Sequence, residues 1–504
     1  MINSEIRWLT HLDMNWNPPK FKILGLWFTH NLEEMEKINT YDKYLETKVL
    51  FNCWAKRSTT PLGKVVVLKS LVLSKLIYLG IMLPNPPDDL IETLQKKCFE
   101  FVWGGKRDKI KRSTTIYHTK LGGMNIPDIK VYIQALKLTW IKRIFNENSG
   151  KWKFLLQKRF PEITTLQKYG ADLLERKHIN PFWNDVFKAY KNVNRKYVPK
   201  TPEELLAEPL FFNGNFKIGK KPFVFPEWVA SNVTTVGALV NRDGKLKSLD
   251  EFIREYKFNP KPLDYFGCIS TIKEHANKSS IEMKSNKDCG EQKIITLLTG
   301  ALKGAKPIYN AILGEKEKSN GCKKWEVILE KDIDWEKVFI KVNKIKEVKM
   351  KWFQLRICHR VLVTNSMLTH MKIVESNKCN FCQIEKDTIL HYLWECPHVQ
   401  TFWNDFLKFI KEKCVHCDRL ELNSTLILLG KDSNIKTDEC FDEIVVKAKF
   451  YIYKCRINKV KPNIQIYVNN DLRLMYKLDK HVHHLEMNID KFYRKWLLYA
   501  NIVN

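Results

Sequence analysis

The chain has 504 residues, enough for about three domains, and 44% of them are apolar, so it can form buried cores. Its 85 lysines and arginines outnumber 56 acidic residues, and the formal net charge of +29 predicts a polyanionic partner, either nucleic acid or an acidic membrane surface. The 15 Trp, 18 Tyr and 27 Phe favour nucleic acid, because bases stack on aromatic faces.

Targeting signals are not evident in the sequence. Residues 1–17 lack a basic start followed by an apolar core, which argues against a signal peptide. The most apolar stretch, residues 65–83, is interrupted by Lys69 and Lys75 and falls short of the about 18 uninterrupted apolar residues of a spanning helix. Thirteen cysteines without a secretory signal indicate a reducing compartment. We therefore expect a protein of the cytoplasm or nucleus that has no membrane partner.

The first 150 residues predict a strand followed by three helices. Residues 21–28 are an apolar run with β-forming side chains and predict the strand. Apolar residues at spacing four, from Tyr41 through Leu45 and Val49 to Cys53, predict one face of the first helix. The second helix is expected over residues 64–83 and the third over residues 88–103. Together they predict a three-helix bundle whose apolar faces form its core.

A basic segment follows the predicted bundle. Residues 104–112 carry five positive charges and one negative charge. A flexible basic loop can bind phosphates without selectivity for the base sequence. The alternative is an ordinary run of solvated charges.

The middle of the chain carries folding signals. Asn213 and Gly214 stand between apolar runs and predict a hairpin. Residues 276–325 are rich in Lys, Ser and Asn and predict a linker.

A basic helix is predicted after this linker, from Trp335 to Arg360. Lys337, Lys341 and Lys344 share one side of it at helical spacing. This face either lies on RNA or is a solvated helix face.

Cysteine and histidine residues form the strongest local pattern. Cys379, Cys382, His391 and Cys396 follow the spacing C-x2-C-x8-H-x4-C. Two cysteines two residues apart can bind one ion from a tight turn, and the other two ligands complete a tetrahedron if their segment is helical or bent. A closed Cys3His shell leaves no open position, so the predicted zinc is structural. The alternative is four unrelated residues, and His398 is a substitute ligand.

Aromatic residues accompany this pattern and suit two roles. Zinc knuckles often stack unpaired bases on aromatic side chains, but the knuckle also needs apolar packing, and core packing is the more frequent role. The residues concerned are Phe381, Tyr392, Trp394 and Trp403.

Two groups of motifs resemble one known family, the LINE-type non-LTR retrotransposon reverse transcriptases. Residues 353–403, which include the cysteine pattern, resemble the zinc-binding C-terminal region of these polymerases. The first group resembles the part that follows the polymerase palm, and it consists of Lys22-Ile-Leu-Gly25, Trp54-Ala-Lys-Arg57, Leu62-Gly-Lys64, Lys69-Ser-Leu71, Phe101-Val-Trp103 and Gly122-Gly-Met124.

The resemblance implies that the first helices are a thumb, which holds the template–primer duplex through its backbone. The phosphate contacts that it implies are Lys56, Arg57, Lys64, Lys106, Arg107, Lys109, Lys111 and Arg112.

We therefore predict a mainly α fold with minor β structure. It combines a thumb-like three-helix bundle, a mixed middle region with hairpins and a C-terminal helical zinc-knuckle domain. The predicted divisions are a residual palm-end strand (1–38), the bundle with its basic loop (39–150), a helical and hairpin connector (151–275), the linker (276–325) and a basic C-terminal domain (326–504) with the knuckle at 379–396.

Catalytic carboxylates are not evident. A polymerase holds two divalent metals about 3.5–4 Å apart, and in the resembled family an aromatic-x-Asp-Asp turn contributes to this. The Asp-Asp pair of this chain, Asp88-Asp89, suits a helix start, and Asp332-Ile-Asp334 suits a helix cap. We expect the fingers and palm to be missing from this chain and no polymerase or nuclease activity from it alone.

Three functions remain open. The first is a non-catalytic remnant of a retrotransposon reverse transcriptase that binds RNA or an RNA/DNA hybrid in a ribonucleoprotein. The second is a thumb and C-terminal module that works in trans with a separately encoded palm. The third is a structural zinc protein whose basic face docks acidic proteins.

Overall fold

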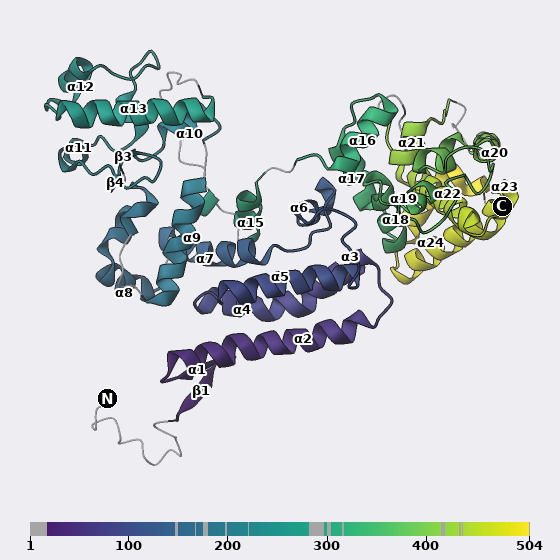
Figure 1. Cartoon of the computed structure of the whole chain (residues 1–504), viewed down its shortest axis with the longest axis horizontal. Helices are drawn as coiled ribbons and strands as arrows, with labels where there is room; N and C mark the ends of the chain where they lie inside the picture. The colour runs from purple at the N-terminus through teal and green to yellow at the C-terminus, as the bar shows by residue number, and fades with distance from the viewer. Residues whose placement is uncertain are drawn as a thin grey trace. The chain divides into compact units, whose positions relative to one another are not determined.

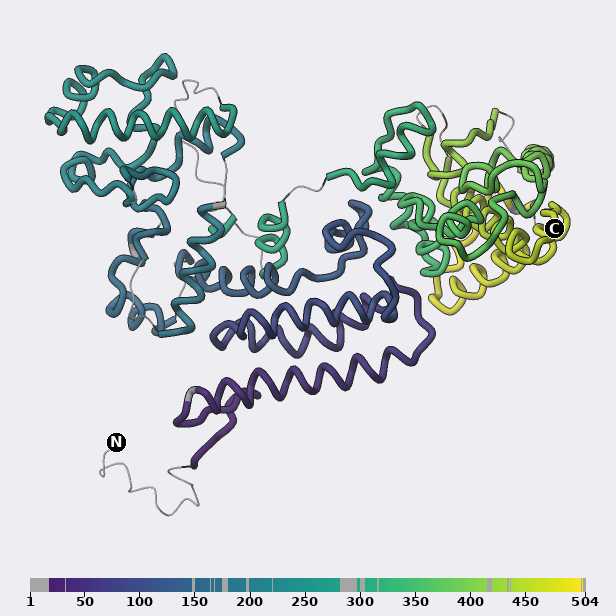
Figure 2. The backbone as a smooth tube through the Cα atoms, viewed as in Figure 1, coloured from purple at the N-terminus to yellow at the C-terminus, as the bar shows by residue number. Residues whose placement is uncertain are grey.

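The computed structural model forms two compact units, and each is assembled from segments that are distant in sequence. Unit 1 comprises residues 1–50, 71–95 and 128–314, and unit 2 comprises residues 51–70, 96–127 and 315–504. The residues that the structure describes, coloured in Figure 2, are 18–146, 150–166, 168–174, 180–196, 199–219, 221–281, 297–299, 304–314, 317–414, 419–432, 435 and 437–502.

The described residues are mostly helical and include two small two-stranded sheets, which confirms the predicted mainly α class. Three helical stretches run from one unit into the other in sequence: α2 (Asp42–Ala55), the continuous run of α3 (Pro61–Val67), η3 (Leu68–Leu73) and α4 (Ser74–Met82), and α5 (Asp88–Trp103).

The other elements of unit 1 are β1 (Lys20–Ile23), β2 (Leu26–Thr29), α1 (Leu32–Glu36), η2 (Lys37–Tyr41), α7 (Ile129–Phe145), α8 (Trp152–Arg159), η5 (Pro161–Thr165), η6 (Ala171–Leu174), α9 (Pro181–Lys196), α10 (Pro202–Leu206), β3 (Lys217–Ile218), β4 (Lys221–Pro222), α11 (Pro226–Ala230), η7 (Val236–Leu239), α12 (Leu249–Tyr256), α13 (Pro262–Ser279) and α15 (Lys306–Leu313) (Figure 1).

The other elements of unit 2 are α6 (Arg112–Thr115), η4 (Thr119–Leu121), α16 (Asn320–Leu329), α17 (Trp335–Lys344), α18 (Val348–Cys358), α19 (Asn365–His370), η8 (His391–Glu395), α20 (Pro397–Lys413), α21 (Ser424–Leu429), α22 (Glu439–Ile457), α23 (Ile464–Ile466), η9 (Tyr467–Leu472), α24 (Arg473–Leu485), α25 (Ile489–Trp496) and η10 (Leu497–Ile502).

The single strand predicted over residues 21–28 is wrong, because the segment forms an antiparallel hairpin. Strand β1 pairs with β2 in the register Ile23 opposite Leu26. The turn between them is made by Leu24 and Gly25, whose φ angles of 49° and 88° match the twist of a two-residue hairpin turn. The run of apolar letters concealed this turn, since leucine is not a usual turn residue.

The three predicted helices form, but the first buries a different face from the predicted one. Tyr41, Leu45 and Val49 are exposed, with Val49 61% accessible. The helix instead places Thr40 and Tyr44 beside an apolar cavity lined by α4, α5 and α7. Because these two inward residues carry hydroxyl groups, the pattern of apolar residues predicts the opposite side of the helix as the buried one.

The helical run Pro61–Met82 is, by length and composition, apolar enough to cross a membrane. That test averages hydropathy along the helix, whereas the prediction required an uninterrupted apolar stretch, which Lys69 and Lys75 break. Core helices pass the same test, and 28% of the apolar window of this run is buried, with Leu62, Val65 and Leu68 among the buried residues of the helix.

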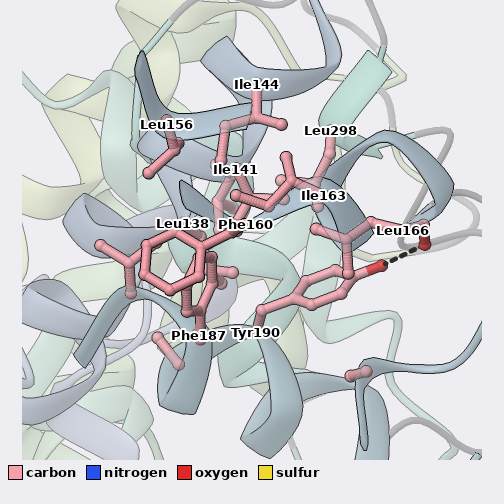
Figure 3. Packing of buried hydrophobic residues seen from close by; sticks show 14 of the residues in the cluster. Leu138, Ile141, Ile144, Leu156, Phe160, Ile163, Leu166, Phe187, Tyr190 and Leu298 are labelled. Atoms are coloured by element: carbon pink, nitrogen blue, oxygen red, sulfur yellow. Dashed lines mark hydrogen bonds between the residues drawn. The ribbon is translucent and has the colours of Figure 1, made fainter. Parts of the chain in front are cut away.

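The first core of unit 1 lies between α7, α8 and α9. Leu138, Ile141 and Ile144 of α7 meet Phe187 and Tyr190 of α9 (Figure 3). The Tyr190 hydroxyl lies 3.5 Å from the carbonyl oxygen of Leu166, so even the polar end of this side chain has a partner. Apolar burial of this kind contributes about 25 cal/mol per Å² and is the main stabilising term for such a core.

The second core of unit 1 is formed mainly by the later part of the predicted connector, from Leu205 onward. Its hairpin pairs β3 with β4, with Ile218 opposite Lys221, so the predicted turn at Asn213-Gly214 lies outside it. The Asn213 side chain is buried, and its Nδ2 donates to the carbonyl oxygen of Pro209 at 2.9 Å and to Glu208 Oε2 at 3.2 Å. Asn213 therefore fills a buried polar position, a role that the turn pattern does not reveal.

The predicted linker, residues 276–325, contains regular structure where it is described. It includes the end of α13, all of α15 and the start of α16. Residues 282–296, 300–303 and 315–316 of this prediction lie outside the described residues.

The helix predicted from Trp335 to Arg360 is two helices in unit 2. Helix α17 ends at Lys344, and α18 begins at Val348. The predicted cap at Asp334 is confirmed, since its side chain accepts a hydrogen bond from the amide of Lys337 at 3.1 Å.

Residues from the first part of the chain complete the core of unit 2. The rings of Trp103 and Trp352 lie 6.0 Å apart, and His359 Nε2 lies 2.7 Å from the carbonyl oxygen of Gly122. Gly122 has a φ of 74°, and a Cβ there would lie 2.3 Å from the Phe339 ring, so this position requires glycine.

A lysine is buried in the core of unit 2. Lys449 on α22 has no exposed surface, and its Nζ lies 2.5 Å from Gln354 Oε1 on α18. Burial lowers the pKa of Lys449 to about 7. The charged form is therefore disfavoured in the folded chain.

The pKa of Lys449 predicts a pH-dependent stability. An unfolded lysine titrates near about 10.4, so between pH 7 and about 10.4 the unfolded chain binds one more proton than the folded chain. The contribution of Lys449 to the free energy of unfolding therefore rises with pH across this window. We expect Lys449→Met to raise the melting temperature at pH 7 and to remove this part of the rise, as measured by thermal unfolding from pH 6 to 10.

The exposed Lys461 offers the control, because Lys461→Met should leave both the melting temperature and its pH dependence close to wild type. Equal pH profiles for wild type and Lys449→Met would contradict the prediction. Gln354 Nε2 retains its bond to the carbonyl oxygen of Leu428 in the variant, which limits the cost of removing the lysine.

Candidate metal centre

A short loop brings the two nearest cysteines together. Lys378 and Lys386 form an antiparallel bridge, and the amide of Cys379 donates to the carbonyl oxygen of Glu385 at 2.8 Å. Within this loop the amide of Gln383 donates to the carbonyl oxygen of Cys379 at 3.0 Å. The resulting tight reversal places the side chains of Cys379 and Cys382 on the same side.

The other two ligand residues lie at opposite ends of one turn. His391 begins the π-helical segment η8, and Cys396 follows its last residue and caps α20. The amide of Cys396 donates to the carbonyl oxygen of His391 at 2.8 Å. The wide π turn therefore brings two residues five positions apart toward the same point.

The four ligand atoms fit a tetrahedral zinc ion. They all lie within 4.8 Å of one another, with Cys379 Sγ 3.9 Å from Cys396 Sγ and Cys382 Sγ 3.5 Å from His391 Nε2. Bonds of about 2.3 Å to sulfur and about 2.0 Å to nitrogen in a tetrahedron give a sulfur–sulfur separation of about 3.8 Å and a sulfur–nitrogen separation of about 3.5 Å. Cys379, His391 and Cys396 are buried and Cys382 is half-buried, so protein surrounds most of the site.

The surroundings of the ligands favour a thiolate at Cys396. A hydrogen bond from Cys379 lowers the pKa of Cys396, and the amides of His398 and Val399 at the start of α20 act in the same direction. The same hydrogen bond, together with burial, raises the pKa of Cys379. A metal ion at this point displaces both protons and replaces the thiol–thiol hydrogen bond by two metal–sulfur bonds.

A buried ion pair supports the loop from behind. Asp387 has no exposed surface and accepts from Arg456 Nε at 3.0 Å and from the amide of Asn365 at 2.6 Å. The guanidinium of Arg456 lies 4.8 Å from the ring of Tyr392, the residue next to His391. Helix α22 therefore fixes the metal-binding loop through one charged pair.

Two asparagine side chains add further hydrogen bonds that hold the metal-binding loop. Asn380 Nδ2 donates to the carbonyl oxygen of Arg456 at 2.9 Å, and Asn365 Nδ2 donates to the carbonyl oxygen of Lys378 at 2.8 Å. The sequence patterns did not reveal Asp387 and Arg456, because a single acid and a single base 69 residues apart carry no local signal.

Residues 306–403 match the family described as zinc-binding in reverse transcriptase. This finding and the ligand geometry confirm the predicted zinc cofactor. We refer to these residues as the zinc-binding region.

A curated relative supports the transposon origin. The chain is 24% identical over 168 residues to an uncharacterized 149 kDa protein of transposon TX1 from Xenopus laevis. The match covers 31% of this chain and 12% of the relative, so the chain spans about an eighth of the relative's length. The predicted resemblance to LINE-type reverse transcriptase polyproteins is confirmed.

The aromatic residues of the zinc-binding region are mainly packing residues. Phe381, Tyr392 and Trp403 are buried, and Trp403 Nε1 donates to the carbonyl oxygen of Leu393 at 2.8 Å. Trp394 is half-buried. The core role of these side chains therefore fits the structure better than a stacking platform does.

The predicted phosphate contacts of the first part of the chain differ in exposure. Lys64 is buried, with its Nζ 5.5 Å from the centre of the Phe101 ring, and Arg112 is paired with Asp108 at 2.6 Å. The following residues are exposed and have no ion-pair partner among the described residues: Lys56, Arg57, Lys106, Arg107, Lys109 and Lys111.

The predicted basic face of α17 is engaged within the protein. Lys337 pairs with Asp334 at 2.7 Å, Lys344 pairs with Glu439 at 2.6 Å, and Lys341 pairs with Asp442 at 2.8 Å. Lys341 Nζ also donates to the carbonyl oxygen of Gly430 at 2.9 Å. A nucleic-acid contact through this face would compete with three carboxylates, so it stays a prediction.

Loss of one ligand should release the metal. We expect the purified chain to contain one zinc ion and Cys382→Ser to lose it, with a fall of about 10 °C in melting temperature, the shift that about 3–5 kcal/mol produces in a domain of this size. Elemental analysis and thermal unfolding measure these effects. Cys53→Ser, at an exposed cysteine away from the site, should retain both zinc and stability. Full zinc occupancy in Cys382→Ser would contradict the assignment of the ligands.

The buried Asp387–Arg456 pair should contribute more to the free energy of unfolding than a more exposed ion pair that also involves α22. Asp387→Asn leaves a buried guanidinium without its carboxylate and should lower the free energy of unfolding by about 3–5 kcal/mol in urea titrations. Asp471→Asn, which breaks the more exposed pair with Lys454, should cost about 0–1 kcal/mol. Equal costs for the two variants would show that the buried pair does not support the loop.

Proposed function

We propose that this chain is a nucleic-acid-binding part of a retrotransposon reverse transcriptase, which holds RNA or an RNA/DNA hybrid and does not polymerise DNA by itself. The observation that carries the proposal is the exposed basic loop before α6, in the same compact unit as the zinc-binding region. The zinc ion has a structural role, because its four protein ligands leave no position for substrate.

The basic loop suits phosphate contacts because its charges are not neutralised internally. Lys106, Arg107, Lys109 and Lys111 project within six residues, and none of them has an ion-pair partner in the described part of unit 2. Lysine and arginine side chains on a flexible loop bind phosphates without base selectivity, through release of counterions. This supports a partner that is recognised by its backbone.

The absence of catalysis is part of the same proposal. Among the described residues, one group of at least three Cys, His, Asp or Glu side chains lies close enough to hold a metal ion, and it is the zinc site. Asp88 lies in the first turn of α5, where its charge suits the helix dipole, and its Oδ1 is 3.2 Å from Lys130 Nζ. A two-metal polymerase site therefore has no candidate in this part of the chain.

Nucleic-acid affinity and its salt dependence test the proposal. We expect the zinc-loaded chain to bind a labelled single-stranded RNA at 50 mM salt in fluorescence anisotropy. The double variant Lys106→Gln/Arg107→Gln should reduce the slope of log affinity against log salt by about 1.4, since each lost contact on a single strand contributes about 0.7.

The control is a pair of lysines on α13 in unit 1, Lys273 and Lys278, whose replacement by glutamine should leave the slope unchanged. No measurable affinity of the wild-type chain for RNA at 50 mM salt would contradict the proposed function. Primer extension by the purified chain alone would contradict its non-catalytic part.

A further inference from the structure

Unit 2 contains a cavity of about 550 Å³ beside the start of α16. One wall comes from residues 109–117, which include the basic loop and α6, and the other from residues 317–323. His359 and Val361 complete the lining. Its volume lies within the range of about 300–1,000 Å³ that is usual for ligand sites.

Unpaired cations gather around this cavity. Lys109 and Lys111 reach it from the loop, and Lys323 reaches it from α16. None of the three has an ion-pair partner in the described residues, whereas Lys318, also in the lining, is held by Glu326 at 2.9 Å and Asp332 at 3.3 Å. Burial and the nearby charges of Arg356 and Lys106 lower the pKa of Lys109. A bound anion would favour the charged form of Lys109.

The backbone around the cavity is held in place by a chain of hydrogen bonds. His359 Nε2 lies 2.7 Å from the carbonyl oxygen of Gly122, and its Nδ1 lies 3.2 Å from Ser319 Oγ. Because a carbonyl oxygen only accepts, Nε2 donates to Gly122, while Nδ1 pairs with Ser319 Oγ, which also donates to Cys322 Sγ at 3.1 Å. Ser319 also caps α16 by accepting from the amide of Cys322 at 3.4 Å.

Helix α16 adds its dipole to the lysine charges. It has ten residues, and its first two, Asn320 and Gly321, line the cavity. The amides of a helix start carry partial positive charge and bind phosphate groups. The loop lysines, Lys323 and the start of α16 therefore favour an anion at the same place.

We propose that this cavity binds a phosphate group of a nucleic-acid strand, held by Lys109, Lys111 and Lys323 at the start of α16. The site joins the basic loop to the zinc-binding region, so one phosphate contacts both segments. It rests on the proposed function for the identity of the strand and adds the place where that strand is held. Glu317 is the carboxylate in the lining, and it opposes the anion.

Two adjacent lysines on α16 provide a matched test. Lys323 lines the cavity and Lys324 does not, and both are exposed. In fluorescence anisotropy with a labelled single-stranded RNA at 0.1 M salt, Lys323→Gln should weaken binding about fivefold, the factor that one contact with a slope of about 0.7 gives. Lys324→Gln should bind as wild type, and thermal unfolding should show that both variants fold normally.

A variant of opposite sign strengthens the test. Glu317→Gln removes the opposing carboxylate and should tighten RNA binding by a similar factor, whereas a merely structural role for Glu317 would leave the affinity unchanged or weaken it. RNA with a 5′-phosphate and RNA with a 5′-hydroxyl distinguish the source of the phosphate. An effect of Lys323→Gln confined to the first RNA identifies a strand end, and an equal effect on both identifies the backbone.

The outcomes separate this site from the proposed function. If the wild-type chain binds RNA but Lys323→Gln and Lys324→Gln have the same affinity, the phosphate site is wrong and nucleic-acid binding stands. If the wild-type chain does not bind RNA, both are wrong. Weaker binding by Glu317→Gln would also overturn the site.

Discussion

The zinc-binding region depends on neutralising charges that are removed from water. The side chains of three cysteines and one histidine meet at a largely buried site, where thiolates are stable only beside a cation. Asp387, on the loop between the two ligand pairs, is also buried and is neutralised by Arg456 of α22. Two electrostatic interactions therefore hold the metal-binding loop, one with the metal and one with Arg456, which is 69 residues from Asp387 in the chain.

Local chemistry explains which parts of the fold can be predicted. The cysteine spacing predicts the metal site because a tight turn must bring Cys379 and Cys382 together wherever it occurs. The acidic start of α5 and the cap at Asp334 are equally local and form as expected. The inward side of the first helix could not be predicted, because Thr40 of η2 and Tyr44 of α2 line the apolar cavity while Leu45 and Val49 are exposed.

The net charge of the sequence likewise does not predict which cations can bind a partner. Composition gives a large excess of lysine and arginine, but it does not say which of these side chains are already neutralised. The three lysines of α17 each meet a carboxylate, two of them on the distant helix α22, so a nucleic-acid contact through this face would compete with these ion pairs. Among the described residues, the segment from Lys106 to Arg112 contains one ion pair, Arg112 with Asp108, and the Glu317 carboxylate lines the cavity beside it without pairing. The folded structure therefore separates cations that already have a carboxylate partner from cations that do not, although the sequence does not distinguish them.

The contact of Gly122 with His359 and Phe339 has a consequence for how the zinc-binding region can be isolated. Residues 96–127 supply the carbonyl oxygen that His359 bonds, the space into which the Phe339 ring fits and the tryptophan that meets Trp352. A fragment cut at the borders of the family match would expose these surfaces and leave the His359 ring without its acceptor. The folding unit is consequently discontinuous, because the zinc-binding region, which begins at residue 306, packs on a segment that begins 210 residues earlier, at residue 96.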